Sequence, residues 1–359
     1  MTAPIGSSTS VKPFETAARG GAVGGRMDEH LAPLVRPNSG PAGIPDAERL
    51  ESSTLMAVWE LSKPRITRLV ALTAAVGFGL NSIGRSADWT TWLVAGAGCL
   101  LGTALSSAGA NALNQCMEIP RDARMLRTMN RPLPSGQLTL RGATIAGLAA
   151  GVAGLAVLWA ACGLPSMLVS LVTMATYLLI YTPLKPVTVL NTWIGAVPGA
   201  LPPLIGWAAA GSVGTTSAEG TWGSLTQPGG WSLFALMYVW QIPHFLAIAW
   251  MHRDDYARGG YRMLPIMDTG GRLTAWMVVA WAVLLVPASL LPWWAMDDRL
   301  TWAYAGVALL SGLIFAGGAA SLLWNQTRAR ARRVFIASII HLPLLLLALV
   351  VDAGVAAWR

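Results

Sequence analysis

The first stretch whose residue types could do chemistry is NALNQCMEIPRDARMLRTMNRPLPSG, Asn111 to Gly136. Asn114, Glu118 and Asp122 are spaced i, i+4 and i+8, which puts them on one face of a helix, with Asn111 one turn earlier. Four arginines interleave with these residues or follow them: Arg121, Arg124, Arg127 and Arg131. Carboxylates hold Mg²⁺, and guanidinium groups bind phosphate oxygens. The stretch therefore predicts a site for a polyphosphate with a divalent cation.

Pro120 lies between Glu118 and Asp122. Inside a helix, proline removes a hydrogen bond and clashes with the preceding turn. We therefore expect the helix to kink or stop at Pro120 and Asp122 to lie in a short loop. The single-face geometry is expected for Asn111, Asn114 and Glu118.

A second polar stretch, WQIPHFLAIAWMHRDDYARGGYRML, runs from Trp240 to Leu264. It places Asp254 and Asp255 among three arginines: Arg253, Arg258 and Arg262. One such cluster after an apolar segment is usually a solvated topology signal, but two of them together with the amides favour a site. The chemistry that needs both is cleavage of an allylic diphosphate, because negative charge on the leaving group is stabilised by carboxylate-held Mg²⁺ and by basic side chains. A low-dielectric site would also shield the allylic cation from water.

Three further side chains are candidates on more limited grounds. Lys185, in Tyr181-Thr-Pro-Leu-Lys185, is the only charge in its connection and either extends to the membrane surface or meets the diphosphate. His244 lies in an apolar segment, where a histidine is either a hydrogen-bond partner between helices or a functional group. His341, in a later apolar segment, is a second histidine of this kind.

Composition shows which elements must position these residues. The chain has 359 residues, of which 54% are hydrophobic and 12% charged, against about 25% charged in a soluble domain. The apolar runs are near the roughly 20 residues that cross a bilayer as a helix. We therefore predict an all-α membrane bundle of nine transmembrane helices, with a central cavity open to the inner side. The predicted spans are 66–82, 91–117, 143–162, 167–181, 189–210, 232–251, 274–295, 302–324 and 335–351.

The distribution of basic residues orients the bundle. Of the 25 Lys and Arg residues, only Arg85, Arg299 and Arg359 fall on the side opposite the N-terminus. The positive-inside rule then places the N-terminus inside and the C-terminus outside. The net charge of +8 is explained by topology, so no nucleic-acid partner is predicted; the bilayer is the expected surroundings. Prolines in the fifth span predict a kinked helix inside the bundle.

The chain divides into a disordered tail at 1–53, a membrane domain at 54–352 and a short tail at 353–359. An amphipathic piece, Thr54 to Ser62, is expected at the membrane interface before the first span. The first tail is more acidic than basic, which argues against a mitochondrial import signal. It favours the bacterial cytoplasmic membrane over the mitochondrial inner membrane. The three scattered cysteines support neither a disulfide framework nor a zinc site.

The motifs together resemble one known family. NxxxExxxD followed by RTxNRPL, at Asn114 to Leu133, resembles the first Asp-rich motif of the UbiA-type intramembrane prenyltransferases. YTPLK, TVLNTWIGAVPGALPPLIGW, WQIPHFLAIAW and DDYARGGYRML resemble its branch of protoheme IX farnesyltransferases, and the likeness runs from Lys63 to Asp352. The resemblance implies Mg²⁺-assisted transfer of a farnesyl group from farnesyl diphosphate to a vinyl group of haem b. The implied product is haem O, a precursor of haem A, and haem A synthase is a candidate partner.

The resemblance also assigns roles to single residues. Metal binding falls on Asn114, Glu118, Asp122 and Asp255, with Asp254 beside them as a catalytic candidate. Diphosphate binding falls on Arg127, Arg131 and Lys185, and haem contact falls on His244, because imidazole can ligate haem iron. Apart from these carried-over roles, His341 is a second candidate for haem contact, and Asn111 and Tyr181 are candidate supporting residues. Glu118 stands where many relatives have Asp, and Pro186 stands where a second basic residue is common. Two alternatives remain open: a prenyltransferase of an aromatic acceptor in quinone synthesis, and a membrane transporter.

Overall fold

A computed structural model of the chain describes residues 46–215, 222–296 and 299–358, and this part of the chain contains helices and turns but no strand. The elements in order are α1 (Asp46–Leu61), α2 (Pro64–Ser82), α3 (Trp89–Asp122), α4 (Leu140–Cys162), α5 (Leu164–Ala175), the π-helix η1 (Thr176–Tyr181), α6 (Thr182–Leu184), α7 (Asn191–Ala200), α8 (Pro202–Gly211), the 3-10 helix η2 (Ser224–Thr226), α10 (Pro228–Met251), α11 (Arg253–Arg258), α12 (Leu264–Met267), α13 (Arg272–Ala295), α14 (Trp302–Trp324) and α15 (Arg328–Ala357). The all-α prediction is confirmed.

The boundaries predicted for the two tails differ from the ends of the helices. The part of the first tail at 1–45 lies outside the described residues, whereas 46–53 belong to α1. Similarly, α15 continues to Ala357, past the expected domain end at residue 352. The interfacial piece expected at Thr54 to Ser62 is the second half of α1, which begins at Asp46.

Eight helical segments of the described chain are long and apolar enough to cross a membrane. Two of them are broken: α5, η1 and α6 form one segment, and α7 and α8 form another. The predicted first span is helix α2, which falls outside these eight because Arg65, Arg68 and Asn81 reduce its apolar content. A bundle of nine spans therefore stays a prediction.

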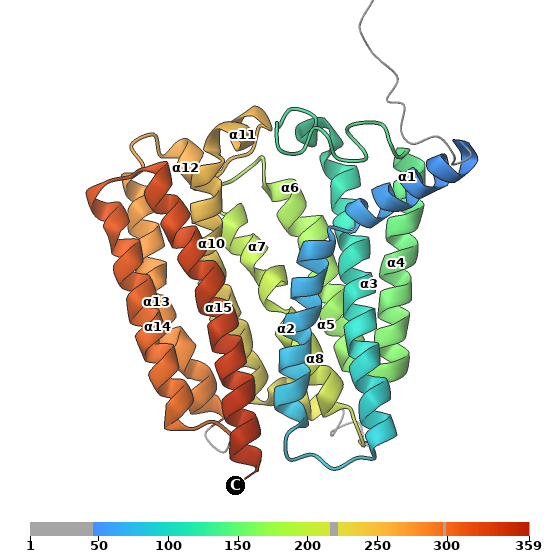
Figure 1. Cartoon of the computed structure of the whole chain (residues 1–359), viewed down its shortest axis with the longest axis vertical. Coiled ribbons are helices and arrows are strands. Elements are labelled where there is room, and N and C mark those ends of the chain that lie inside the picture. The colour runs from blue at the N-terminus through green and yellow to red at the C-terminus, as the bar shows by residue number, and fades with distance from the viewer. Residues whose placement is uncertain (1–45, 216–221, 297–298, 359) are drawn as a thin grey trace, which may run out of the picture. The chain divides into compact units, whose positions relative to one another are not determined.

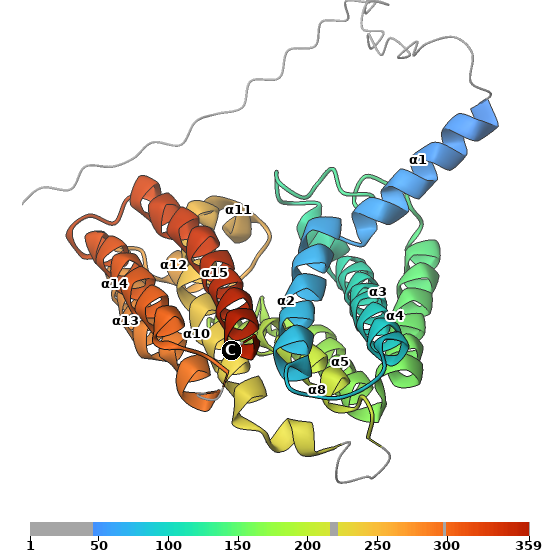
Figure 2. The ribbon, with the colours of Figure 1, turned by 60° about the horizontal axis from the view of Figure 1, so that its bottom comes forward.

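Helices α7 and α8 lie inside the bundle, as expected for the fifth predicted span. An 18-residue window of this segment is 83% buried. α8 packs on α2 and α5, while α7 packs on α10 and η1. The helix breaks between Ala200 and Pro202, so the kink predicted from its prolines is confirmed. On either side of this segment, α3 pairs with α4, and α10 packs with α13 and α15 (Figures 1 and 2).

Glycines allow α2 and α8 to touch backbone to backbone. A Cβ atom built on Gly206 would lie 1.7 Å from the carbonyl oxygen of Ala74, and one on Gly77 would lie 1.9 Å from that of Pro203. Small residues permit such close helix pairs in membranes, where packing rather than water expulsion drives association. This contact fixes α2, which begins next to the candidate site.

We expect Gly206→Ala to destabilise the protein, because its methyl group would force α2 and α8 apart; overpacking of this kind costs about 1–3 kcal/mol. The measurement is the thermal unfolding midpoint in detergent. Gly317→Ala is the matched control, since Gly317 is also helical and a Cβ there meets nothing within 4 Å. Equal midpoints for the two variants would contradict the close contact.

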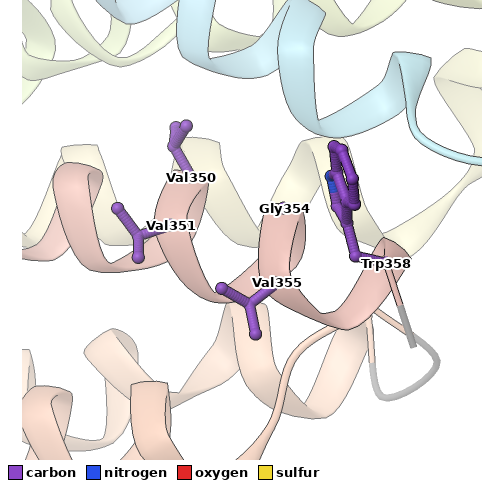
Figure 3. Close-up of a pocket in the computed structure, with 5 residues that line it drawn as sticks. All are labelled: Val350, Val351, Gly354, Val355 and Trp358. Carbon is purple, nitrogen blue, oxygen red and sulfur yellow. The ribbon is translucent and has the colours of Figure 1, made fainter.

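The two ends of the bundle differ in chemistry. The short helices α6, α11 and α12, together with α1, gather at one end (Figure 1). At the other end, the last turns of α15 form an apolar pocket lined by Val350, Val351, Gly354, Val355 and Trp358 (Figure 3). None of the predicted polar site residues lines this pocket. The central cavity expected to open to the inner side stays a prediction.

Candidate active site

The polar face of α3 lines the candidate site. The helix continues through Pro120 and ends at Asp122, so the expectation that it would stop at the proline is wrong. Pro120 lies within the last turn, which confines the disturbance to the helix end. Asn111, Asn114, Glu118 and Asp122 are all buried. The single-face geometry therefore includes Asp122.

Lys185 turns inward rather than towards solvent. Its Nζ atom donates to Oε1 of Glu118 at 2.8 Å and lies 4.5 Å from the ring centroid of Tyr181. The buried amide of Asn114 donates to the Thr182 hydroxyl at 3.0 Å. Thr182 begins α6, directly after η1, and Lys185 caps its end. The π-helical turn therefore brings both residues onto the polar face of α3. The Lys185 side chain is buried, which excludes the reading in which it extends to the membrane surface.

Lys63 belongs to the same cluster, although its spacing gave no hint of a role there. Its Nζ atom donates to Oδ1 of Asn114 at 2.8 Å. Its backbone φ of 47° is in the left-handed region and is the one positive φ of a non-glycine residue in the described chain. Such backbone strain is held only where the surroundings enforce it; here Gln115 Nε2 donates to the Leu61 carbonyl at 2.7 Å. Burial and then the Arg131 charge lower the pKa of Lys63 to about 7.

Asp255 ties α11 to the loop that follows α3. It accepts hydrogen bonds from the backbone N–H of Leu126 at 2.8 Å and of Arg127 at 3.3 Å, and from the Arg258 guanidinium at 2.7 Å. Burial opposes the charge, but these three bonds outweigh it and hold the pKa of Asp255 below its usual range. The carboxylate therefore stays ionised at neutral pH.

The structure does not bring Asp254 into the cluster. Its side chain is 73% exposed and its nearest basic atom is Nε of Arg253 at 3.7 Å. Arg127 instead lies over the ring of Tyr256 at 5.6 Å and donates to its hydroxyl at 3.4 Å. Of the two adjacent aspartates, only Asp255 faces the loop that carries the predicted diphosphate-binding arginines.

Every buried carboxylate of the site has a basic partner. Arg131 Nη1 lies 2.7 Å from Oδ2 of Asp122. Lys185 Nζ lies 2.8 Å from Oε1 of Glu118, and Arg258 Nη2 lies 2.7 Å from Oδ1 of Asp255. No group of three or more His, Cys, Asp and Glu side chains is placed to hold a metal ion within the described ranges. These pairs neutralise the site, and an incoming anion with a cation could exchange partners with them.

Tyr261, which sequence reasoning also missed, closes the cluster from the α11 side. The centroid of its ring lies 6.0 Å from Lys185 Nζ. Burial and then the Glu118 charge raise the pKa of Tyr261, so the hydroxyl stays protonated. Its motif, GGYRML, was noted in the sequence, but nothing there distinguished the tyrosine from its neighbours.

The two candidate histidines lie on α10 and α15, outside this cluster, and contact different helices. His244 Nδ1 contacts Ser338 Oγ at 2.7 Å, and its ring stacks on Trp240 and Phe335. His341 is buried with its ring centroid 5.6 Å from that of Phe315 on α14. Its ring nitrogens have no hydrogen-bond partner within 3.5 Å among the described residues. His244, on α10, therefore faces α15, whereas His341, on α15, packs against α14.

The chain was compared with models of known protein families. The model of the UbiA prenyltransferase family matches residues 70–342. The chain belongs to the UbiA prenyltransferase family. It is therefore a prenyltransferase and a multi-pass membrane protein. Membership of the UbiA family confirms the resemblance first indicated by NxxxExxxD and RTxNRPL.

Two relatives show which branch of the UbiA family this chain resembles. A protoheme IX farnesyltransferase of Solibacter usitatus is 41% identical over 80% of this chain and 94% of its own. One from Opitutus terrae is 39% identical over 82% of this chain and 93% of its own. They confirm the resemblance to the protoheme IX farnesyltransferase branch.

Solved structures of UbiA proteins share the fold. A digeranylgeranylglyceryl phosphate synthase superposes with a TM-score of 0.66 at 19% identity, covering 84% of this chain and 98% of the other. A UbiA homologue from Archaeoglobus fulgidus, bound to GPP and Mg²⁺, has a TM-score of 0.56 at 15% identity and covers 84% of this chain and 100% of its own. At these identities the likeness concerns the fold alone.

Proposed function

We propose that this prenyltransferase transfers the farnesyl group of farnesyl diphosphate to a vinyl group of haem b, giving haem O. The observation that carries the proposal is the set of buried carboxylate–cation pairs at one end of the bundle, in a chain 41% identical to a protoheme IX farnesyltransferase. A diphosphate needs cations, and its counter-ion needs carboxylates. Helices with apolar sides supply surroundings for the prenyl tail.

We assign a Mg²⁺ site to Asn114, Glu118, Asp122 and Asp255. The donors fit in kind, because Mg²⁺ takes oxygen ligands and is usually held by one or two carboxylates together with substrate phosphates and waters. A cluster of three protein carboxylates is therefore not required. Bound there, the ion would neutralise part of the diphosphate charge. Glu118 and Asp122 are released for this role when the diphosphate takes over Lys185 and Arg131.

The basic side chains stabilise the leaving diphosphate in this proposal. Lys185 and Arg131 already lie 2.8 Å and 2.7 Å from carboxylates of the site, and Arg127 is held on the loop that Asp255 fixes. Lys63 lies beside Asn114 with its pKa lowered to about 7, and the negative charge of a bound diphosphate would favour its cationic form. Donors that are fixed before reaction lower the barrier most, because they need no reorganisation as charge develops.

We also propose where the protein resides and what it meets. The inner end carries the site, the N-terminus lies inside and the C-terminus outside. The membrane is the bacterial cytoplasmic membrane, and the product passes to a haem A synthase. Among the described helices, His244 is the proposed haem contact and His341, packed against Phe315, is the second candidate.

The test is an acceptor assay on the purified full-length protein in detergent. It receives Mg²⁺, farnesyl diphosphate and either haem b or 4-hydroxybenzoate, and product masses are measured. Farnesylated haem is the expected product. A prenylated benzoate without farnesylated haem would overturn the acceptor while keeping the enzyme class.

Removal of divalent ions should abolish turnover. We expect farnesyl transfer to stop in excess EDTA and to return when Mg²⁺ is added above the chelator, because the diphosphate charge is then compensated again. Circular dichroism in EDTA checks that the helices remain folded. Full activity in EDTA would contradict the metal site.

A further inference from the structure

Helix α15 sets the tautomer of the histidine on α10. Ser338 Oγ donates its single hydroxyl proton to the Phe335 carbonyl at 2.6 Å. In the 2.7 Å contact between Ser338 Oγ and His244 Nδ1, the histidine N–H must then be the donor. Nε2 consequently carries the free lone pair, and a neutral imidazole binds metal through that lone pair. A hydrogen bond from the other ring nitrogen is also how metal-binding histidines are commonly oriented.

Aromatic rings pack against the imidazole of His244. Its ring lies 4.7 Å from that of Trp240 and 5.1 Å from that of Phe335, with interplanar angles of 22° and 29°. Trp240 Nε1 donates to the Ser338 carbonyl at 2.9 Å. Ser338 therefore holds Trp240 through its backbone and His244 through its side chain. The result is a fixed array of three rings between α10 and α15.

Two arginines lie on the same face of α15, nearer the inner end. Arg328, Arg332 and Phe335 are spaced i, i+4 and i+7, which aligns them on a helix. Both arginines are exposed. Burial and then the charges of Arg127 and Arg328 lower the pKa of His252, the residue that follows α10. Cations at a helix N-terminus oppose its dipole, and bound carboxylates would remove that cost.

We propose that α10 and α15 form the acceptor subsite: His244 Nε2 ligates the haem iron, Ser338 fixes its tautomer, and Arg328 and Arg332 pair with the two propionates. This subsite rests on the proposed function, in which haem b is the acceptor. Haem held in this way has its carboxylate edge at the inner end, where guanidinium groups bind carboxylates well. Its apolar edges lie deeper, against Trp240 and Phe335.

The first measurement is a haem b titration of the full-length protein in nanodiscs, followed by absorption spectroscopy. We expect Ser338→Ala to change the His-ligated spectrum and to weaken haem binding about 10–100-fold, as loss of an orienting partner does. Ser338→Thr, which keeps the hydroxyl, should restore both. A wild-type spectrum in Ser338→Ala would overturn the tautomer role, whatever its activity.

The second measurement tests the arginines. We expect Arg328→Gln with Arg332→Gln to weaken haem binding about 10–100-fold, because the propionates lose their charge-assisted hydrogen bonds to guanidinium groups. Haem dimethyl ester, which lacks the propionate charges, should bind this variant and the wild type equally. Arg333→Gln is the matched control, since Arg333 is exposed on another face of α15. Equal haem affinity in the double variant and this control would overturn the propionate contact.

Failure of the proposed function has a different signature. A wild-type protein that binds farnesyl diphosphate and prenylates 4-hydroxybenzoate but binds no haem would overturn the acceptor, and the subsite with it. A wild-type protein that farnesylates haem, with unchanged haem binding in the Ser338 and arginine variants, would overturn the subsite alone.

Discussion

Replacing Asp255 by Asn is expected to lower the rate of farnesyl transfer about 10²–10³-fold, the usual loss when one fixed electrostatic group is removed. The substitution keeps the size of the side chain but removes the charge that holds Arg258 and the backbone N–H groups of Leu126 and Arg127. The loop with the proposed diphosphate-binding arginines then loses its tether to α11. The rate is measured in single turnovers with saturating farnesyl diphosphate.

Asp254→Asn is the matched control, because it changes the neighbouring residue by the same chemistry. Asp254 is 73% exposed and its one ion pair is 3.7 Å long. Exposed pairs of this kind contribute about 0–1 kcal/mol, so we expect activity within about threefold of wild type. Similar losses in both variants would contradict the assignment of the tethering role to Asp255 alone.

Two substitutions of Lys63 should separate its charge from its backbone. Lys63→Met removes the cation and keeps a side chain at φ 47°, whereas Lys63→Gly removes both the cation and the strain. We expect kcat/KM for farnesyl diphosphate to fall about 10²-fold in both variants, as expected for a lost cation of the diphosphate site. The Gly variant should unfold at a higher temperature than the Met variant, because a side chain in the left-handed region costs about 1 kcal/mol.

The kcat/KM and the unfolding temperature test different claims about Lys63. Wild-type kcat/KM in Lys63→Met would remove Lys63 from the site. An equal or lower unfolding midpoint in Lys63→Gly would mean that the turn before α2 is not strained. Unfolding is followed in detergent at constant protein concentration, since the comparison is between variants of one chain.

The part of the site that could be predicted is local in sequence. Asn114 and Glu118 share a helix face by spacing alone, and Lys185 is conspicuous as an isolated charge in an apolar chain. Lys63 could not be found in this way, because its contact with Asn114 depends on a left-handed turn that α3 holds in place. Basic residues before a span also signal topology, which concealed its role.

Adjacent carboxylates show the same limit. Nothing in the sequence distinguishes Asp254 from Asp255, because both follow α10 and both are next to arginines. Which of them faces the loop depends on how the short helix α11 is turned. The span count is limited for a related reason: α2 carries Arg65 and Arg68 near its start, so composition alone does not separate it from an interfacial helix.

The π-helix η1 makes this segment tolerant of a change in chain length. Both the backbone N–H and the hydroxyl of Thr182 donate to the Tyr177 carbonyl, a spacing of i to i+5. Such a turn contains one residue more than an α-helical turn. Because one widened turn accommodates the extra residue, deleting one residue within 176–181 would restore α-helical geometry and leave Lys185 directed towards Glu118. The segment can therefore accept a one-residue deletion within 176–181, and alignments with relatives that lack the extra residue require a gap here.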